Sequence, residues 1–177
     1  MSGPVESLAP TVVEAPSNNN VGFFLQNVGG ETGKWTPAVG PASGRQSAQV
    51  TAAAPAATTS LTAVMGGLAG AITPAFSTQV EITIVGVVKN GTISDGSTLD
   101  LRIGTGAAPA NGAAVAGTLV GLAQTFTEAV AGQTQGFVLH GFATVIPGTS
   151  YWFDFSQLSV TGGTTTVTGV TATALEI

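Results

Sequence analysis

The chain has 177 residues, of which only 7% are Asp, Glu, Lys or Arg, whereas 44% are hydrophobic. Ordinary soluble domains carry about 25% charged residues, so this composition is typical of a protein whose surface is covered by partners. The absence of cysteine excludes disulfides and thiolate metal sites. The four basic residues are scattered and the net charge is −5. Phosphate recognition needs clustered cations, so we expect no nucleic-acid partner.

No segment has the pattern of a membrane-spanning helix or of a signal peptide. The Ala-rich stretch 51–71 is interrupted by Pro55 and by a Thr-Thr-Ser sequence. It therefore lacks the roughly 18 consecutive apolar residues that a spanning helix needs. The first residues contain no basic segment followed by an apolar one. We expect neither a membrane partner nor a cleaved leader.

The N-terminal region, residues 1–57, differs from the rest of the chain in composition and in hydrophobic periodicity. It is rich in Pro and Gly and shows little periodicity. It nevertheless carries large apolar side chains that a disordered tail does not need, namely Phe23, Phe24, Leu25 and Trp35. We predict an extended arm and linker whose apolar residues anchor it to a neighbouring subunit or another protein, because a few buried anchors carry most of the energy of such contacts. The alternative is that these residues pack back onto the chain's own domain.

From residue 58 to residue 177 the pattern is that of β-structure. Short runs rich in Thr and Val are separated by Gly, Pro, Asn and Asp. The clearest strand is 79–88, where apolar and polar side chains alternate. Further strands are predicted at 99–103, 118–126, 136–145, 151–156 and 164–177. No amphipathic helix is evident, so the sequence predicts an all-β domain, an antiparallel β-sandwich of jelly-roll type.

The predicted strand 151–156 has an unusual composition. Tyr151, Phe153 and Phe155 share one face, and Trp152 lies on the other. Large aromatic side chains on both faces indicate a strand that is buried on both sides, against the chain itself or against a neighbour.

Residues 72–177 resemble a class of small β-domain proteins found in tailed-phage virions. The resemblance is carried by the sequences RIGTG at 102–106, PANG at 109–112 and PGTSYW at 147–152. Such proteins are head decoration (cement), head-fibre or tail-fibre components. The resemblance implies a jelly-roll-like sandwich and a homotrimer. It also implies a place in the virion, with the major capsid protein as a partner. For a decoration protein this place is the outer surface of the capsid.

Residues suited to catalysis are few. His140 is the only histidine, and no Ser and acid are singled out as its partners in a catalytic triad. Glycoside hydrolysis needs two facing carboxylates, and the β-region offers Glu81, Asp95, Asp100, Glu128, Asp154 and Glu176. Asp95 precedes a glycine, as in a turn, and Asp100 shares a strand face with Arg102, as in a surface ion pair. We predict that the chain is not an enzyme. An interface role for His140, sensitive to its protonation, is an alternative.

Three segments of the sequence have some features of a ligand-binding loop. Residues 95–98 provide oxygen atoms but too few carboxylates for a tight Ca²⁺ site. The Gly-rich loop 104–109 lacks the Lys and the helix of a phosphate-binding loop, and 30–34 lacks the Ser or Thr that follows the Lys. We therefore expect no metal and no cofactor.

The leading hypothesis is a capsid decoration protein that oligomerises and stabilises a phage head. The alternative is a head-fibre, tail-fibre or receptor-binding protein that contacts host glycans through Tyr151 or Trp152. A carbohydrate-binding module outside any virus is a third possibility.

Overall fold

The computed structural model describes residues 45–51 and 54–177. In these residues the chain forms nine β-strands and no helix. The strands are β1 (Ser47–Thr51), β2 (Val64–Met65), β3 (Gly70–Ile72), β4 (Gln79–Asn90), β5 (Gly96–Thr105), β6 (Thr118–Thr127), β7 (Gln135–Thr144), β8 (Tyr151–Ser159) and β9 (Thr165–Glu176). The described part of the chain has no helix long and apolar enough to cross a membrane.

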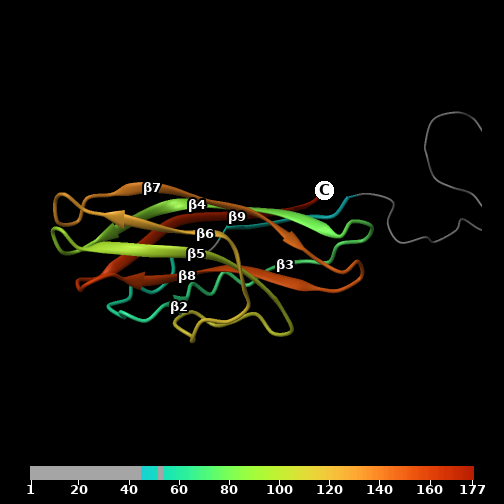
Figure 1. Ribbon diagram of the computed structural model, residues 1–177, viewed down its shortest axis with the longest axis horizontal. Helices are drawn as coiled ribbons and strands as arrows, with labels where there is room; N and C mark the ends of the chain where they lie inside the picture. The colour runs from blue at the N-terminus through green and yellow to red at the C-terminus, as the bar shows by residue number, and fades with distance from the viewer. Residues whose placement is uncertain (1–44, 52–53) are drawn as a thin grey trace, which may run out of the picture. The chain divides into compact units, whose positions relative to one another are not determined.

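The strands form two antiparallel sheets that pack face to face (Figure 1). Sheet A has the order β1-β9-β4-β7, and sheet B has the order β2-β8-β5-β6, with β3 also paired to β8. The pairing is nested: β1 pairs with β9, β2 and β3 with β8, β4 with β7, and β5 with β6. A long hairpin folded over itself in this way is a jelly roll. The predicted all-β sandwich is confirmed.

The predicted strands correspond to long strands of the structure. The run 79–88 lies within β4, and the run 164–177 contains β9. The N-terminal boundary differs from the sequence prediction, because β1 lies inside the range 1–57 that was assigned to the arm and linker. Its residues pair with β9 in a regular register from Ser47 opposite Leu175 to Thr51 opposite Thr171. The sandwich therefore begins before residue 58.

The core lies between the sheets and is built largely by alternation of side chains along the strands. In β4 every second residue points inward, and Val80, Ile82 and Ile84 are fully buried. Phe153 and Phe155 of β8 provide the largest buried rings. The rest of the core includes Leu99, Leu101, Ile103, Val120, Phe137, Leu139, Val167, Val170, Ala172 and Ala174.

Strand β8 is buried on both faces, as its aromatic composition predicted. The indole of Trp152, on the face away from the core, is 5% exposed. It lies against the backbone of Gly104 and Gly117, and its Nε1–H donates a hydrogen bond of 3.2 Å to the carbonyl oxygen of Thr105. The outer face of β8 is therefore covered by the chain's own segments, without a neighbour.

Candidate interaction surface

The predicted arm anchors Phe23, Phe24, Leu25 and Trp35 lie outside the described residues. The candidate surface is therefore built from the jelly roll alone. It depends on where the fold places the few ionisable side chains and the exposed apolar ones.

Glu176, near the C-terminus, ties three segments together at one end of the sandwich. Its carboxylate accepts hydrogen bonds from the backbone N–H groups of Gln46, Ala75, Phe76 and Ser77. Burial alone would raise the pKa of Glu176, but these four donors outweigh burial and lower the pKa to about 2. The side chain is an ionised structural anchor.

The opposite end of the sandwich is closed by two further acids. Asp95 accepts hydrogen bonds from the backbone and hydroxyl groups of Thr161, at 2.8 and 2.7 Å, and from the backbone of Gly96. Burial would raise the pKa of Asp95, but the hydrogen bonds from Thr161 and Gly96 outweigh it and lower the pKa. Glu128 accepts a hydrogen bond from the backbone N–H of Asn90. Asp95 therefore joins the β4–β5 connection to the β8–β9 connection, and Glu128 joins the β6–β7 connection to the end of β4.

Asp154, on the outer face of β8, likewise accepts hydrogen bonds from backbone N–H groups. Its two oxygens accept hydrogen bonds from the backbone N–H groups of Gly67, Leu68 and Phe155. Here burial is the larger effect, and it raises the pKa of Asp154 although the three donors oppose it. The contact holds the segment between β2 and β3 against the sheet.

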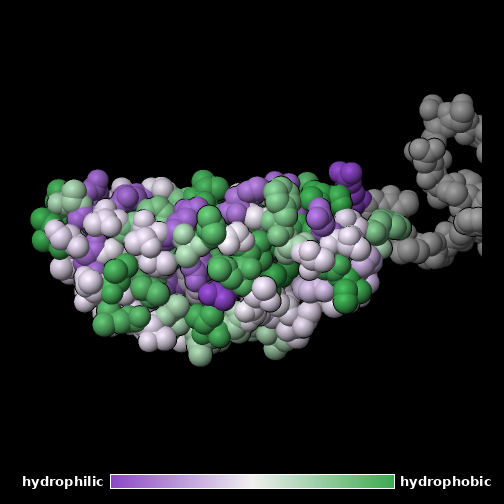
Figure 2. All heavy atoms as spheres, in the orientation of Figure 1, coloured by the Kyte–Doolittle hydropathy of each residue, from purple (hydrophilic) through white to green (hydrophobic). Residues whose placement is uncertain are grey.

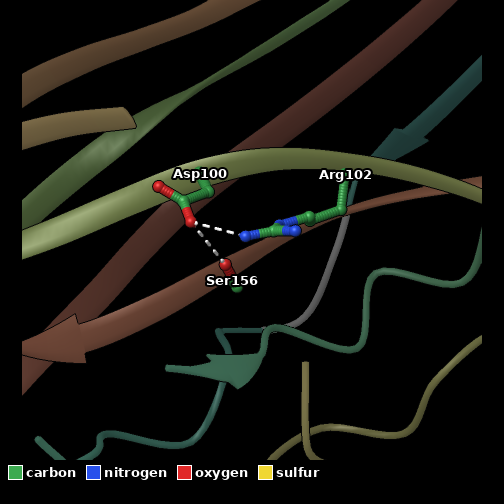
Figure 3. A network of polar contacts seen from close by, with 3 residues as sticks. All are labelled: Asp100, Arg102 and Ser156. Atoms are coloured by element: carbon green, nitrogen blue, oxygen red, sulfur yellow. Dashed lines mark hydrogen bonds and ion pairs between the residues drawn. The ribbon is translucent and has the colours of Figure 1, made fainter. Parts of the chain in front are cut away.

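Asp100 and Arg102 form the predicted ion pair, with 2.9 Å between Arg102 Nη2 and Asp100 Oδ2. The pair is not a surface pair, however, because the two side chains are only 14% and 17% exposed. The hydroxyl of Ser156, on the neighbouring strand β8, also donates to Asp100 Oδ2 at 3.3 Å (Figure 3). The prediction of a solvent-exposed pair was wrong because chain segments outside the strands cover this face of sheet B.

With these acids held internally, the surface of the described residues has very little charge. Among Asp, Glu, Lys and Arg, only Arg45 and Lys89 are exposed in this part of the chain. Thirteen large hydrophobic side chains are exposed there. Green and white areas dominate the face seen in Figure 2, with purple residues scattered among them. Exposed apolar side chains mark an interaction surface where they form a contiguous patch, whereas scattered ones are ordinary.

Five of these exposed apolar residues lie on β6, on β7 and on the neighbouring strand β4, and we call this group the β6–β7 patch. Its members are the exposed residues Val85, Leu119, Leu122, Val138 and Phe142. Val85 and Val138 are directly opposite each other in the pairing of β4 with β7. Leu119 and Phe142 line the same cleft of about 390 Å³, whose lining contains no acid and no basic residue.

His140 lies on the same face of β7 between Val138 and Phe142, and it contacts Glu81. The distance between His140 Nε2 and Glu81 Oε1 is 2.9 Å, and both side chains are partly exposed on the outer face of sheet A. The ring of His140 packs edge-on against Phe142, with 5.1 Å between ring centroids. Glu81 also lines a second cleft of about 400 Å³, over β1, β9 and β4, in which it is the one ionisable residue. The geometry brings no second carboxylate to this cleft.

The remaining sequence candidates are engaged in internal contacts. In the loop 95–98, the Ser97 hydroxyl contacts Thr165 at 2.8 Å and the Thr98 hydroxyl contacts Thr125 at 2.9 Å, so the loop oxygens do not converge. No group of three or more His, Asp or Glu side chains suited to a metal ion occurs in the described residues.

Of the two aromatic residues proposed for glycan contact, Trp152 is not available, whereas Tyr151 lines the cleft of about 390 Å³. Trp152 is buried, and the hydroxyl of the half-buried Tyr151 accepts a hydrogen bond of 3.0 Å from the backbone of Ile146. Two other aromatic side chains are exposed in the described residues, Phe76 and Phe142, and Phe142 lies beside His140. Its place on the outer face could be inferred from the alternation in 136–145, but its neighbours on β6 could not.

Comparison with known proteins adds no relative: the sequence matches no protein-family model and no curated protein.

Proposed function

We propose that the chain is a non-enzymatic structural subunit of a virion, a capsid decoration protein that associates with copies of itself and with the major capsid protein. The observation that carries this proposal is the surface of the described residues, where thirteen large hydrophobic side chains are exposed and only two charged ones. Such a surface loses little hydration free energy from ionic groups when it is covered, and it gains about 25 cal/mol for each Å² of apolar area removed from water.

Two further features support the proposal. The jelly roll is a fold of viral capsid proteins, although lectins and cupins also use it, so the fold alone gives only an analogy. The acids that would be needed for hydrolysis instead hold backbone N–H groups or pair with Arg102 and His140. Many weak copies of one contact, repeated over a shell, become strong collectively.

The test is sedimentation of the full-length chain with purified empty capsids of the phage concerned. We expect saturable co-sedimentation and a higher melting temperature of the decorated capsid. A chain that stays in the supernatant at all concentrations contradicts the proposal. Replacing Phe23, Phe24 and Leu25 together by Ser tests the arm separately, with Leu61→Ser as a control in the jelly roll. Unchanged binding of the triple variant would refute the role of the arm and leave the decoration function standing.

A second candidate, binding of a host glycan by a fibre or receptor-binding protein, is favoured by one feature. The cleft over β1, β9 and β4 is lined by hydroxyl, amide and carboxylate groups, including Gln49, Glu81 and Thr173. These groups suit hydrogen bonds to sugar hydroxyls. Binding of the isolated chain to a glycan array, lost in Gln49→Ala, would support this candidate, and an empty array would exclude it.

A further inference from the structure

Asp95 and Glu128 lie opposite each other at the end of the sandwich where β4 ends and β5 begins. The backbone N–H of Glu128 donates a hydrogen bond of 3.0 Å to the carbonyl oxygen of Asp95, which continues the pairing of β5 with β6. Two residues further along these strands, Ser97 and Phe126 are paired on the face directed toward sheet A. Alternation places Asp95 and Glu128 on the same inner face, where directly opposed residues have Cβ atoms about 4.5 to 5.5 Å apart.

Both carboxylates are almost completely removed from solvent. Asp95 is 3% exposed and Glu128 is 1% exposed. The two ion pairs of the described residues involve Asp100 and Glu81 instead, so no Lys, Arg or His side chain of this part of the chain neutralises either acid. Two buried like charges this close repel each other strongly, because their surroundings screen them little. A positive charge bound between them would remove this cost.

One oxygen of each carboxylate is free to bind such a charge. Asp95 Oδ1 accepts the hydrogen bonds from Thr161 and Gly96. Glu128 Oε1 accepts the hydrogen bond from the backbone of Asn90. The other oxygens, Asp95 Oδ2 and Glu128 Oε2, are buried and have no hydrogen-bond partner among the described residues. A buried acceptor without a donor is costly, whereas carboxylate oxygens are the ligands that hard divalent cations prefer.

Neutral oxygen atoms lie in the same region, around the two glycines before β9. A Cβ atom at Gly163 would lie 2.1 Å from Asn90 Oδ1 and 2.6 Å from Thr92 Oγ1. A Cβ atom at Gly162 would lie 3.5 Å from Asp95 Oδ2, although the backbone of Gly162 makes no hydrogen bond to this oxygen. An amide, a hydroxyl and a carboxylate oxygen therefore face one pair of glycines, and all three are kinds of oxygen suited to Ca²⁺.

We propose that Asp95 Oδ2 and Glu128 Oε2 bind one divalent cation, Ca²⁺, at this end of the jelly roll. Ca²⁺ accepts carboxylate, amide, carbonyl and water oxygens in a flexible arrangement, whereas Mg²⁺ demands nearly ideal octahedral geometry and keeps several waters. A buried site with acids from two different connections suits Ca²⁺ better. The loop 95–98 alone has too few carboxylates, and the fold adds the second one from the β6–β7 connection. This inference goes beyond the proposed function and does not depend on it.

The experiment is thermal unfolding of the full-length chain, first freed of metal with EDTA and then supplied with CaCl₂ or MgCl₂. Sodium chloride of equal ionic strength is the reference, so that general screening of charge is subtracted. With two carboxylates we expect a dissociation constant of about 0.1 to 1 mM. About 10 mM Ca²⁺ should then raise the melting temperature by about 3 °C or more, and Mg²⁺ should raise it less. A melting temperature that Ca²⁺ leaves unchanged overturns the proposal.

Variants of the two acids locate the site. Asp95→Asn and Glu128→Gln each keep an oxygen for the backbone donors but lose the charge, so the effect of Ca²⁺ should disappear in both. Asp154→Asn is the matched control, because Asp154 is also a buried acid but both of its oxygens accept hydrogen bonds, and its Ca²⁺ effect should be complete. Circular dichroism identifies a variant that does not fold, and the other variant then decides. A complete Ca²⁺ effect in a folded Asp95→Asn or Glu128→Gln variant overturns the proposal.

Discussion

The backbone N–H of Gln46 donates a hydrogen bond of 2.9 Å to the carboxylate of Glu176, 130 residues later in the sequence. Through this carboxylate the start of β1, the loop before β4 and the end of β9 are held at one point. Similar contacts by Asp95 and Asp154 join other loops to the sheets. Acids that resembled candidate catalysts in the sequence are thus anchors of the jelly roll, and their use inside the fold leaves the surface poor in charge.

Replacement of Glu176 by Gln should reduce stability most at neutral pH. The pKa of Glu176 is lowered from 4.5 to about 2 in the folded chain. Its stabilisation is therefore fully present above pH 4.5 and is lost as the pH falls from 4.5 toward 2. We expect Glu176→Gln to lower the melting temperature clearly at pH 7 and very little at pH 2. Thermal unfolding followed by circular dichroism at pH 7, 4.5, 3 and 2 measures this difference.

Glu81→Gln is the control for the loss of one carboxylate. Glu81 is partly exposed and contacts only His140 among the described residues. Its replacement should change the free energy of unfolding by no more than about 0.5 kcal/mol. Equal effects of the two substitutions would show that the backbone contacts of Glu176 do not stabilise the fold.

The strands could be predicted from the sequence, but the anchors could not. Alternation of apolar and polar residues is a local signal, so β4 and β7 were found close to their true bounds. The four backbone partners of Glu176 lie about 100 residues or more before it in the sequence. Gly67 and Leu68 lie 87 and 86 residues before Asp154, and no local pattern marks these distant partners. The exposure of Leu122 likewise depends on the approach of β6 to β7. The short strand β1 was missed because its five residues, Ser-Ala-Gln-Val-Thr, contain one large apolar residue and lie next to an Ala- and Thr-rich stretch that resembles a linker.

Breaking the pair of Asp100 and Arg102 should cost more than removing both charges. Arg102→Met leaves the mostly buried carboxylate of Asp100 without its cation, and we expect a loss of about 2 to 4 kcal/mol in the free energy of unfolding. The double variant Asp100→Asn, Arg102→Met removes the uncompensated charge and should recover part of that loss. Urea unfolding at pH 7 compares the two. A double variant less stable than Arg102→Met would contradict this account.

Gly104 should not tolerate a side chain, because Trp152 packs directly on it. A Cβ atom at Gly104 would lie 2.4 Å from the Trp152 ring, and the backbone of Gly117 packs closely on the same ring. We expect Gly104→Ala to reduce the free energy of unfolding by about 1 to 3 kcal/mol and to alter the near-ultraviolet spectrum of the tryptophans. Gly136→Ala, at a strand position where a Cβ meets nothing within 4 Å, is the matched control and should be close to neutral.

Asp154 should show a pH dependence opposite to that of Glu176. Burial raises its pKa above 3.8 in the folded chain, so its contribution to stability is largest at low pH and decreases as the pH rises through the folded pKa. Asp154→Asn keeps one acceptor for the N–H groups of Gly67 and Leu68 but cannot ionise. Its stability deficit relative to the unmodified chain should therefore shrink between pH 3.5 and pH 7, as measured by urea unfolding. Asp154→Ala leaves both N–H groups without their acceptor, at a cost of about 1 to 3 kcal/mol, and should remain less stable at both pH values. A deficit of Asp154→Asn that grows with pH would show that the hydrogen bonds to the ionised carboxylate outweigh its burial.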